Sequence, residues 1–347
     1  MRGGVELGPE PLTVLSPPTD TAMVDGCAVE LAALLLGHLE SVCASDDRLG
    51  VLMRYALLPG GKLLRPLLLL ETVAALGGDP GAALPAAAAL EMLHAATLVH
   101  DDIIDQDALR RGRPSVAARF GQADALVGGD AMMCAALGQA RALATSGYGA
   151  EQALRVLDVI STAAVEVSRG QMMEADLAGR MDCAMAQYLR MVRLKTGALL
   201  DAATRAAAVL TEAEPPHVRA LARFADHLGI AFQMQDDLLP YAEDDRAAGK
   251  PALSDLRNRR PTLPVLIAFG NATPQQRLLL QDLWQRPAED AQHALAGLLE
   301  AAGALHAARA TAADHLAAAL AALEDLPPGQ HRDHLAAMAG RLAARRA

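Results

Sequence analysis

Two pairs of adjacent aspartates carry the clearest chemical potential in this sequence. Asp101 and Asp102, with Asp105 close behind, follow the apolar run LEMLHAATLV, and Asp236 and Asp237 follow the apolar run FADHLGIAFQMQ. Helical positions four apart share one face, so ionised Asp101 and Asp105 repel each other. A close pair of this kind costs about 4 kcal/mol at an effective dielectric near 20. A divalent cation would remove this repulsion, and hard oxygen ligands favour Mg²⁺ or Ca²⁺.

The first aspartate cluster alone is equally compatible with a solvated helix terminus. The second cluster favours the metal interpretation, because both clusters end amphipathic helical runs. If the two helices face each other, their carboxylates enclose a small group of metal ions. Because Mg²⁺ keeps open coordination positions, such a cage also holds phosphate oxygens.

Side chains that could hold a phosphate lie in short, motif-like settings. Lysine is scarce, since Lys62, Lys195 and Lys250 are the only lysines among 31 basic residues, and each lies near a glycine. One such lysine by itself is more simply a surface charge, but two acidic clusters shift the balance toward phosphate binding. The further candidates are Arg65, Arg110, Arg111, Thr196, Gln233 and His94, the last being a possible phosphate donor on the first aspartate helix.

A helical frame must position these residues. Helical patterning starts near Gly26 and continues to the end of the chain, with breaks at clusters of Gly and Pro that divide it into about ten helices or more. No segment alternates as a strand would. We therefore predict one all-α domain over residues 26–347. Residues 1–25, rich in Gly and Pro, are predicted to form a disordered tail, which is more simply an inert extension than a docking peptide.

Composition narrows the function further. The chain of 347 residues is 52% hydrophobic but only 3% aromatic, and its formal net charge is −10. The negative charge argues against a nucleic-acid partner, which needs a basic face. No apolar run reaches about 18 residues, so no membrane span is predicted. None of the four cysteines forms a CxxC pair, and there is no secretory leader pattern, so we expect reduced thiols in a cytoplasmic protein.

Taken together, the motifs resemble the trans-isoprenyl diphosphate synthases, also called polyprenyl synthetases. DDIIDQDALRRGRP looks like the first aspartate-rich motif of that family, and FQMQDD looks like the second. PGGKLLRP, LKTG and the series GK, SDL and TLP occur in the family's order. The resemblance covers residues 31 to 346. It implies an isoprenoid synthase fold, a helical bundle around a deep apolar pocket, assembled as a homodimer.

The resemblance also implies an activity and a role for each motif residue. The activity is the head-to-tail, 1′-4 condensation of isopentenyl diphosphate with an allylic diphosphate: dimethylallyl, geranyl or farnesyl diphosphate. By position, Asp101, Asp105 and Asp236 would bind Mg²⁺, three ions in the family, and Asp102 and Asp237 would support them. The residues implied to hold the allylic diphosphate are Arg110, Lys195, Thr196, Gln233 and Lys250. Those implied to hold isopentenyl diphosphate are Lys62, Arg65, His94 and Arg111. The implied catalytic set is Asp101, Asp102, Asp105, Lys195, Asp236 and Asp237.

The second motif departs from the family at its last position. The family usually has a third aspartate there, whereas this chain has Pro240, whose side chain cannot bind metal and which disfavours helix at Leu239. We expect Asp236 to suffice for metal binding, with Asp244 or Asp245 as possible substitutes through water. We therefore expect activity to survive.

Product length depends, in the family, on the residue five before the first aspartate. Here it is Ala96, with Thr97 beside it and Leu93 one turn below, and a neighbouring helix could add Met132 or Met133. Because alanine leaves the pocket open, we expect a product of C20 or longer, or C15 if a methionine blocks it. The rivals are a class I terpene cyclase, which normally lacks the RRGxP and GGKxxRP motifs, and a non-catalytic partner subunit of a prenyl synthase.

Overall fold

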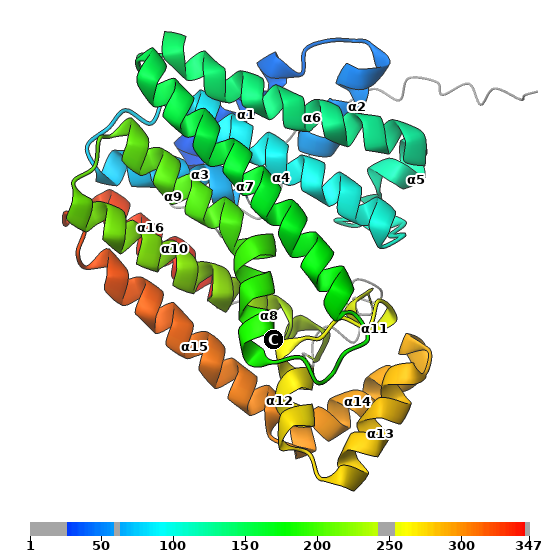
Figure 1. Cartoon of the computed structure of the whole chain (residues 1–347). Helices are drawn as coiled ribbons and strands as arrows, with labels where there is room; N and C mark the ends of the chain where they lie inside the picture. Colours follow the sequence, from blue (N-terminus) through cyan, green and yellow to red (C-terminus); the bar gives the residue numbers. More distant parts are fainter. Residues whose placement is uncertain (1–25, 59–62, 242–253, 344–347) are drawn as a thin grey trace, which may run out of the picture.

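The computed structural model describes residues 26–58, 63–241 and 254–343. Within these ranges the chain is almost entirely helical, which confirms the predicted fold class (Figure 1). The first helix begins at Gly26, where helical patterning was predicted to start. The predicted N-terminal tail lies outside the described residues, and so do Lys62, Lys250, Asp244 and Asp245.

The helices run from α1 to α16, which is more than the sequence breaks indicated. Their bounds are α1 (Gly26–Val42), α2 (Arg48–Leu57), α3 (Leu64–Ala75), α4 (Leu84–Ile104), α5 (Val116–Phe120), α6 (Gln122–Ala142), α7 (Ala150–Leu177), α8 (Met185–Val192), α9 (Ala198–Leu210), α10 (Pro215–Asp236), α11 (Ser254–Arg257), α12 (Leu263–Asn271), α13 (Pro274–Gln285), α14 (Ala288–Ala301), α15 (Ala304–Leu323) and α16 (Gln330–Ala343). Single glycines cause two of the unpredicted breaks, since Gly121 has φ 91° and Gly303 has φ 67°.

The segment after the first aspartate cluster has a local feature that the sequence did not predict. There β1 (Leu109–Arg110) and β2 (Arg113–Pro114) pair as a short antiparallel hairpin. Arg111 and Gly112 form the turn with φ 54° and 75°. Positive φ at both central positions is typical of a type I′ turn, which favours glycine at the second one. The hairpin therefore explains the glycine of RRGRP and sends its arginines in different directions.

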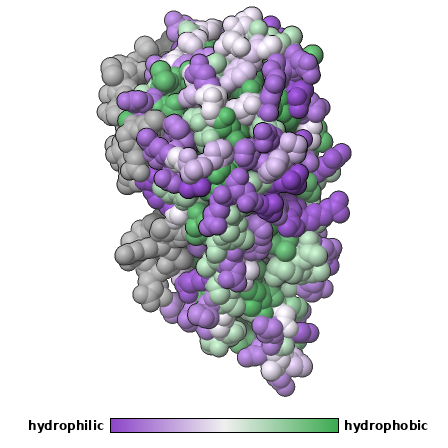
Figure 2. All heavy atoms as spheres, turned by 90° about the vertical axis from the view of Figure 1, so that its left-hand side faces the viewer, coloured by the Kyte–Doolittle hydropathy of each residue, from purple (hydrophilic) through white to green (hydrophobic). Residues whose placement is uncertain are grey.

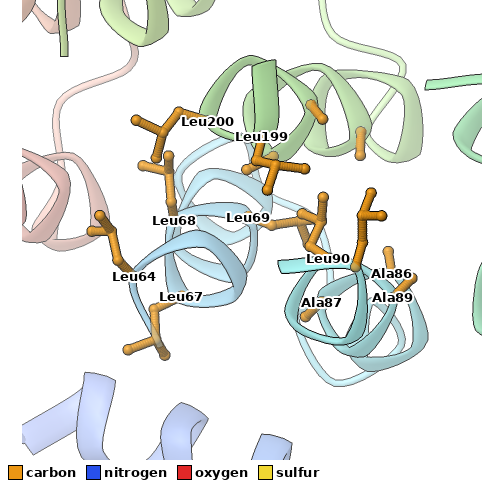
Figure 3. Packing of buried hydrophobic residues seen from close by; sticks show 14 of the residues in the cluster. Leu64, Leu67, Leu68, Leu69, Ala86, Ala87, Ala89, Leu90, Leu199 and Leu200 are labelled. Carbon is orange, nitrogen blue, oxygen red and sulfur yellow. The ribbon is translucent and has the colours of Figure 1, made fainter. Parts of the chain in front are cut away.

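Helix α4 lies at the centre of the bundle. Every residue from Pro85 to Leu93 is buried, so this half of the helix is enclosed on all sides. Leu64, Leu68 and Leu69 of α3 and Leu199 and Leu200 of α9 belong to the same core (Figure 3). Alanines on α4, such as Ala86 and Ala89, allow close helix packing there. The central helix thus delivers the first aspartate motif from a rigid core.

A second, smaller core forms around α8 and α12 to α15. It includes Tyr188, Leu263, Trp284, Leu295 and Leu305, and it adjoins the C-terminal end of α10 (Figure 1). The two aspartate motifs are therefore anchored differently. The first comes from the large core through α4, and the second ends α10, which contributes Phe224 to the large core and Met234 to the small one.

The surface of the molecule is mixed in polarity. Hydrophilic and hydrophobic side chains are interspersed on the face shown in Figure 2. Among the described helices, none is both long enough and apolar enough to cross a membrane.

Candidate active site

Both aspartate pairs lie at the C-terminal ends of long helices. Asp101 and Asp102 occupy the last turn of α4, with Asp105 as its C-cap, and Asp236 ends α10, with Asp237 as its C-cap. The helix dipole is negative at a C-terminus, where cations rather than carboxylates are normally favoured. These positions thus increase the electrostatic cost of the aspartates and strengthen their attraction for cations.

The second aspartate of the first pair is fixed by an arginine. Asp102 is 2% exposed, and its Oδ1 accepts hydrogen bonds from Nε of Arg110 at 2.8 Å and from the Nη2 of the same side chain. Burial raises the pKa of Asp102, and the Arg110 guanidinium opposes that rise. In this state Arg110, a predicted diphosphate ligand, pairs with a carboxylate from its own motif.

The second aspartate of the other pair is enclosed by hydrogen bonds. Asp237 is 3% exposed and accepts from the Tyr188 hydroxyl at 2.8 Å, the Leu263 amide at 2.8 Å and the Gln233 amide at 2.9 Å. Gln233 in turn accepts from the Thr196 hydroxyl at 2.6 Å. Burial raises the pKa of Asp237 to about 7 despite these bonds. The structure therefore brings together three predicted site residues in one polar chain.

The first aspartate of each pair is more open than the second. Asp101 and Asp236 are both partly exposed, whereas Asp102 and Asp237 are buried. Burial raises the pKa of Asp101 and repulsion from Asp105 adds to this, while Lys195 acts in the opposite direction. A carboxylate with a raised pKa, adjoining another carboxylate, has unmet need for positive charge. Carboxylate oxygens are the ligands that a hard divalent cation prefers, and this need for charge applies to Asp101, whereas Asp105 already pairs with Arg260.

Two residues that the sequence reasoning missed connect the site. Glu174, near the end of α7, accepts from Lys195 Nζ at 2.5 Å, and the same oxygen forms an ion pair with Arg260 Nε at 3.1 Å. Arg260 also pairs with Asp105 and, at 3.2 Å, with Asp255. No spacing rule in the sequence identifies Glu174, but Arg260 lies between SDL and TLP, two motifs already singled out.

A local distortion positions Lys195. Residues Arg193–Gly197 form one turn of π-helix between α8 and α9, and such turns are frequent at functional sites. A Cβ on Gly170 of α7 would lie 2.4 Å from the Lys195 backbone nitrogen, and one on Gly229 of α10 would lie 2.9 Å from Gly197 Cα. Only glycine at both positions lets α7 and α10 approach this turn so closely, so the wide turn and its two glycine neighbours form one packing unit.

The predicted isopentenyl diphosphate ligands lie on the other side of the first motif. Arg65 Nη1 of α3 is 3.1 Å from His94 Nε2 of α4. Burial, aided by Arg65, lowers the pKa of His94 well below its ordinary value, so the ring is neutral and accepts the hydrogen bond. Burial also lowers the pKa of Arg65, and the charges of Glu91 and Asp236 oppose this. Asp236 is thus close enough to act on Arg65, which links the second aspartate motif to this group.

A hollow opens beside this group, between α2, α4 and the hairpin. Glu91, Arg110 and Arg111 line its charged part, and Ala95, Leu98 and Val99 line its apolar part. Burial raises the pKa of Glu91, with Arg111 and then Arg65 acting against it. Glu91 is a further residue that the sequence reasoning missed.

The residues proposed to set product length lie deeper in the same core. Ala96 and Met132 have no exposed surface, Leu93 is 1% exposed, and Met133 packs against the same cluster. The Thr97 hydroxyl donates to the His94 carbonyl at 2.7 Å. Leu93, Ala96 and Met132 therefore belong to the large core along α4 and α6, and Met133 packs against that core.

Known proteins resemble this chain over most of its length. The family model described as polyprenyl synthetase matches residues 46–300. Geranylfarnesyl diphosphate synthase of Aeropyrum pernix is 36% identical over 283 residues, covering 80% of this chain and 88% of the relative. The solved geranylgeranyl pyrophosphate synthetase of Pyrococcus horikoshii superposes with a TM-score of 0.84 at 31% identity, covering 91% of this chain and 96% of that one.

A further solved structure concerns ligands. The polyprenyl synthase of Caulobacter crescentus, complexed with calcium and isoprenyl diphosphate, matches with a TM-score of 0.80 at 28% identity, over 92% of this chain and 97% of that one. These matches define the class of protein as a prenyltransferase with the isoprenoid synthase fold. The chain belongs to the polyprenyl synthetase family.

Proposed function

We propose that this protein condenses isopentenyl diphosphate head-to-tail with an allylic diphosphate to give a trans-polyprenyl diphosphate. The observation that carries the proposal is that two aspartate motifs end α4 and α10 with basic side chains beside each of them: Lys195 and Arg260 act on Asp101, and Arg65 lies close enough to act on Asp236. Family membership and the names of the relatives support the same reaction.

The metal proposed for the site is Mg²⁺, in three ions, held by Asp101, Asp105 and Asp236. When bound, the ions supply electrostatic stabilisation of the departing diphosphate. Asp237 then acts by position, because its hydrogen bonds with the Tyr188 hydroxyl and the Leu263 amide hold the end of α10 in place, whereas Asp102 orients Arg110 before the diphosphate binds.

The side chains that we propose to bind the two diphosphates divide into two groups. Arg110, Lys195, Thr196 and Gln233, with Lys250 outside the described residues, are proposed to hold the allylic diphosphate. Arg65, His94 and Arg111, with Lys62 outside the described residues, are proposed to hold isopentenyl diphosphate. Binding would exchange existing carboxylate partners for phosphate oxygens, so Lys195 would leave Glu174 and Arg110 would leave Asp102. The proton lost in the condensation needs no side-chain base, because the departed diphosphate can accept it.

The proposed product is C20 or longer, with dimethylallyl, geranyl or farnesyl diphosphate as the primer. The small side chain of Ala96 supports this product length, because a growing chain could pass it below the first motif when the neighbouring core side chains move. The geranylgeranyl and geranylfarnesyl products named for the two relatives support the same range.

A homodimer through α6 and α7 is the proposed assembly. These two helices expose large apolar side chains that a monomer would leave in water: Leu126 at 52%, Val127 at 63%, Leu154 at 66%, Val165 at 50% and Met172 at 71% exposure. We also propose a cytoplasmic location, supported by the free thiols of Cys43, Cys134 and Cys183.

Product sizing tests the proposed reaction. The pure protein is incubated with Mg²⁺, labelled isopentenyl diphosphate and each allylic primer in turn, and the products are sized after dephosphorylation. We expect labelled chains longer than the primer, and an Asp101→Asn variant that folds but makes none. A cyclic hydrocarbon would indicate a terpene cyclase instead, and no product from any primer would indicate a non-catalytic partner subunit.

A further inference from the structure

A group of metal-ligand side chains lies between α3 and α16, outside the two aspartate motifs. His331 and His334 stand three apart in the first turns of α16, and Glu71 projects toward them from α3. Their Nδ1 atoms lie 2.7 Å and 3.3 Å from the same Glu71 oxygen, Oε2. One potential ligand atom from each of the three residues lies within 4.8 Å of the others. Helical residues three apart share one face, so both rings can serve one ion.

The environment of Glu71 makes this group unusual. Glu71 has no exposed surface, and within the described part of the chain its ion-pair partners are these two histidines. Its second oxygen, Oε1, is buried and lacks a hydrogen-bond partner among the described residues. A buried carboxylate is costly unless it is paired and hydrogen-bonded, or coordinates a metal. A divalent cation bound by these three side chains would neutralise the charge of the buried carboxylate.

We propose that Glu71, His331 and His334 form a binding site for one Zn²⁺ ion. Imidazole nitrogen with a carboxylate oxygen is a donor set that zinc prefers, and three protein ligands leave one position for water. Zn–N bonds of about 2.0–2.1 Å place tetrahedral ligands about 3.3 Å apart. This matches the 3.3 Å between His334 Nδ1 and Glu71 Oε2, while His331 Nδ1, at 2.7 Å, would move outward to bind the ion. His331 keeps 31% of its side chain exposed, which leaves the ion a route from solvent.

Zinc binding requires a change of tautomer but no net loss of protons from neutral histidines. In the metal-free state each Nδ1–H donates to Glu71, whereas in the zinc state each Nδ1 binds the ion and the proton sits on Nε2. Glu71 can then bind through either oxygen, including Oε1. Its negative charge is neutralised inside the core, where the ion attracts it most strongly.

A simpler interpretation is that the three residues only anchor the C-terminal helix through hydrogen bonds. The arrangement of the bonds disfavours it, because two donors converge on Oε2 while Oε1 remains unpaired. An anchor built for hydrogen bonding would satisfy both oxygens of a fully buried carboxylate. A zinc ion would instead fasten α16 to α3, the helix that carries Arg65 near its start.

Metal analysis of the full, tag-free chain tests the proposal. The protein is stripped with a chelator, kept in saturating Mg²⁺ so that the aspartate motifs are occupied, and titrated with Zn²⁺. We expect one tightly bound zinc per chain by elemental analysis and a rise in melting temperature of about 5 °C at a hundredfold excess over the dissociation constant. Cobalt in place of zinc should show the visible absorption of a low-coordinate site.

Variants assign the bound ion. We expect His331→Ala/His334→Ala to lose this zinc and the thermal shift, while His293→Ala/His306→Ala, which removes two exposed histidines elsewhere, keeps both. If the double variant does not fold, the single variant His331→Gln tests zinc binding instead. His331 is partly exposed at the start of α16, so this change should disturb the fold less. The proposal is overturned if the wild-type chain binds no zinc, or if the folded variant binds as much as the wild type.

Discussion

Lys195 Nζ lies 2.5 Å from Glu174 Oε2, in a contact that the motifs alone did not reveal. The same oxygen forms an ion pair with Arg260, whose other nitrogens pair with Asp105 and Asp255. Glu174 thus keeps two cations beside the first aspartate motif in the absence of a diphosphate. When a diphosphate binds, the Lys195 and Arg260 side chains need to move only a short distance from Glu174 to contact its oxygens. This placement reduces the reorganisation that catalysis requires.

Replacing Glu174 tests this role. In Glu174→Gln, Lys195 and Arg260 lose the charge that orients them, and we expect turnover to fall about 10- to 100-fold with the fold retained. Steady-state kinetics with Mg²⁺ and both diphosphates gives the measurement. Glu151→Gln, an exposed site on the same helix, should keep full activity. Equal activity of Glu174→Gln and wild type would show that the carboxylate has no part in catalysis.

The close approach of α7 to the π-helical turn predicts a second effect. In Gly170→Ala the new methyl group would meet the Lys195 backbone at 2.4 Å, so the turn must shift. We expect a loss of stability of about 1–3 kcal/mol and a larger loss of activity than that of any surface variant. Chemical denaturation and kinetics measure the two effects. Gly138→Ala on α6, whose Cβ would meet nothing within 4 Å, is the matched control and should be neutral or stabilising.

Product length should respond to bulk at Ala96. Ala96 is fully buried, and a phenylalanine there would block the path proposed for the growing chain below the first motif, so Ala96→Phe should give shorter products. Chromatography of the dephosphorylated products reads out the length. Because overpacking can cost about 1–3 kcal/mol, Ala96→Leu serves as a milder variant with an intermediate product. An unchanged distribution in a folded, active variant would mean that the growing chain does not pass Ala96.

The buried state of His94 predicts a pH dependence of stability. Its pKa is lowered well below the usual value of about 6.5, first by burial and then by Arg65. Below that pH the unfolded chain binds a proton that the folded chain does not, so unfolding becomes easier as the pH falls. Urea denaturation between pH 8 and pH 5 should show this loss, and His94→Gln, which can still accept from Arg65, should show less of it. The exposed control His306→Gln should follow the wild type.

A steeper or equal loss in His94→Gln would contradict the assignment of a lowered pKa to this ring. The imidazole resonances of His94 offer an independent check, since they should stay in the neutral form at pH values where exposed histidines titrate.

The sequence predicted the parts of the site that depend on local spacing. Asp101, Asp105 and Asp236 lie at helix ends because apolar helical runs precede them, and Thr196, Gln233 and Asp237 meet as their motifs indicated. These predictions needed only helical periodicity and the order of known motifs.

The remaining features depend on contacts between distant segments. Glu174 and Arg260 are 86 positions apart in the printed numbering and become neighbours only when α7 packs beside the TLP segment. The π-helical turn at Lys195 reflects packing against Gly170 and Gly229 rather than any preference of RLKTG itself. The hairpin of RRGRP was missed because two-residue strands have no alternating pattern to read.

The central claim is that this site assembles a working metal centre although Pro240 replaces the last aspartate of the second motif. Pro240 lies four residues after Asp236, the last residue of α10, in a short 3-10 turn from Leu239 to Tyr241, so the proposal assigns the direct metal contact of this motif to Asp236. The most direct measurement is the steady-state turnover of the unaltered chain at saturating Mg²⁺, with labelled isopentenyl diphosphate and an allylic primer. The account predicts sustained turnover that a chelator abolishes and Mg²⁺ restores. Near-zero turnover by protein whose circular dichroism and melting transition are those of the folded chain would contradict it.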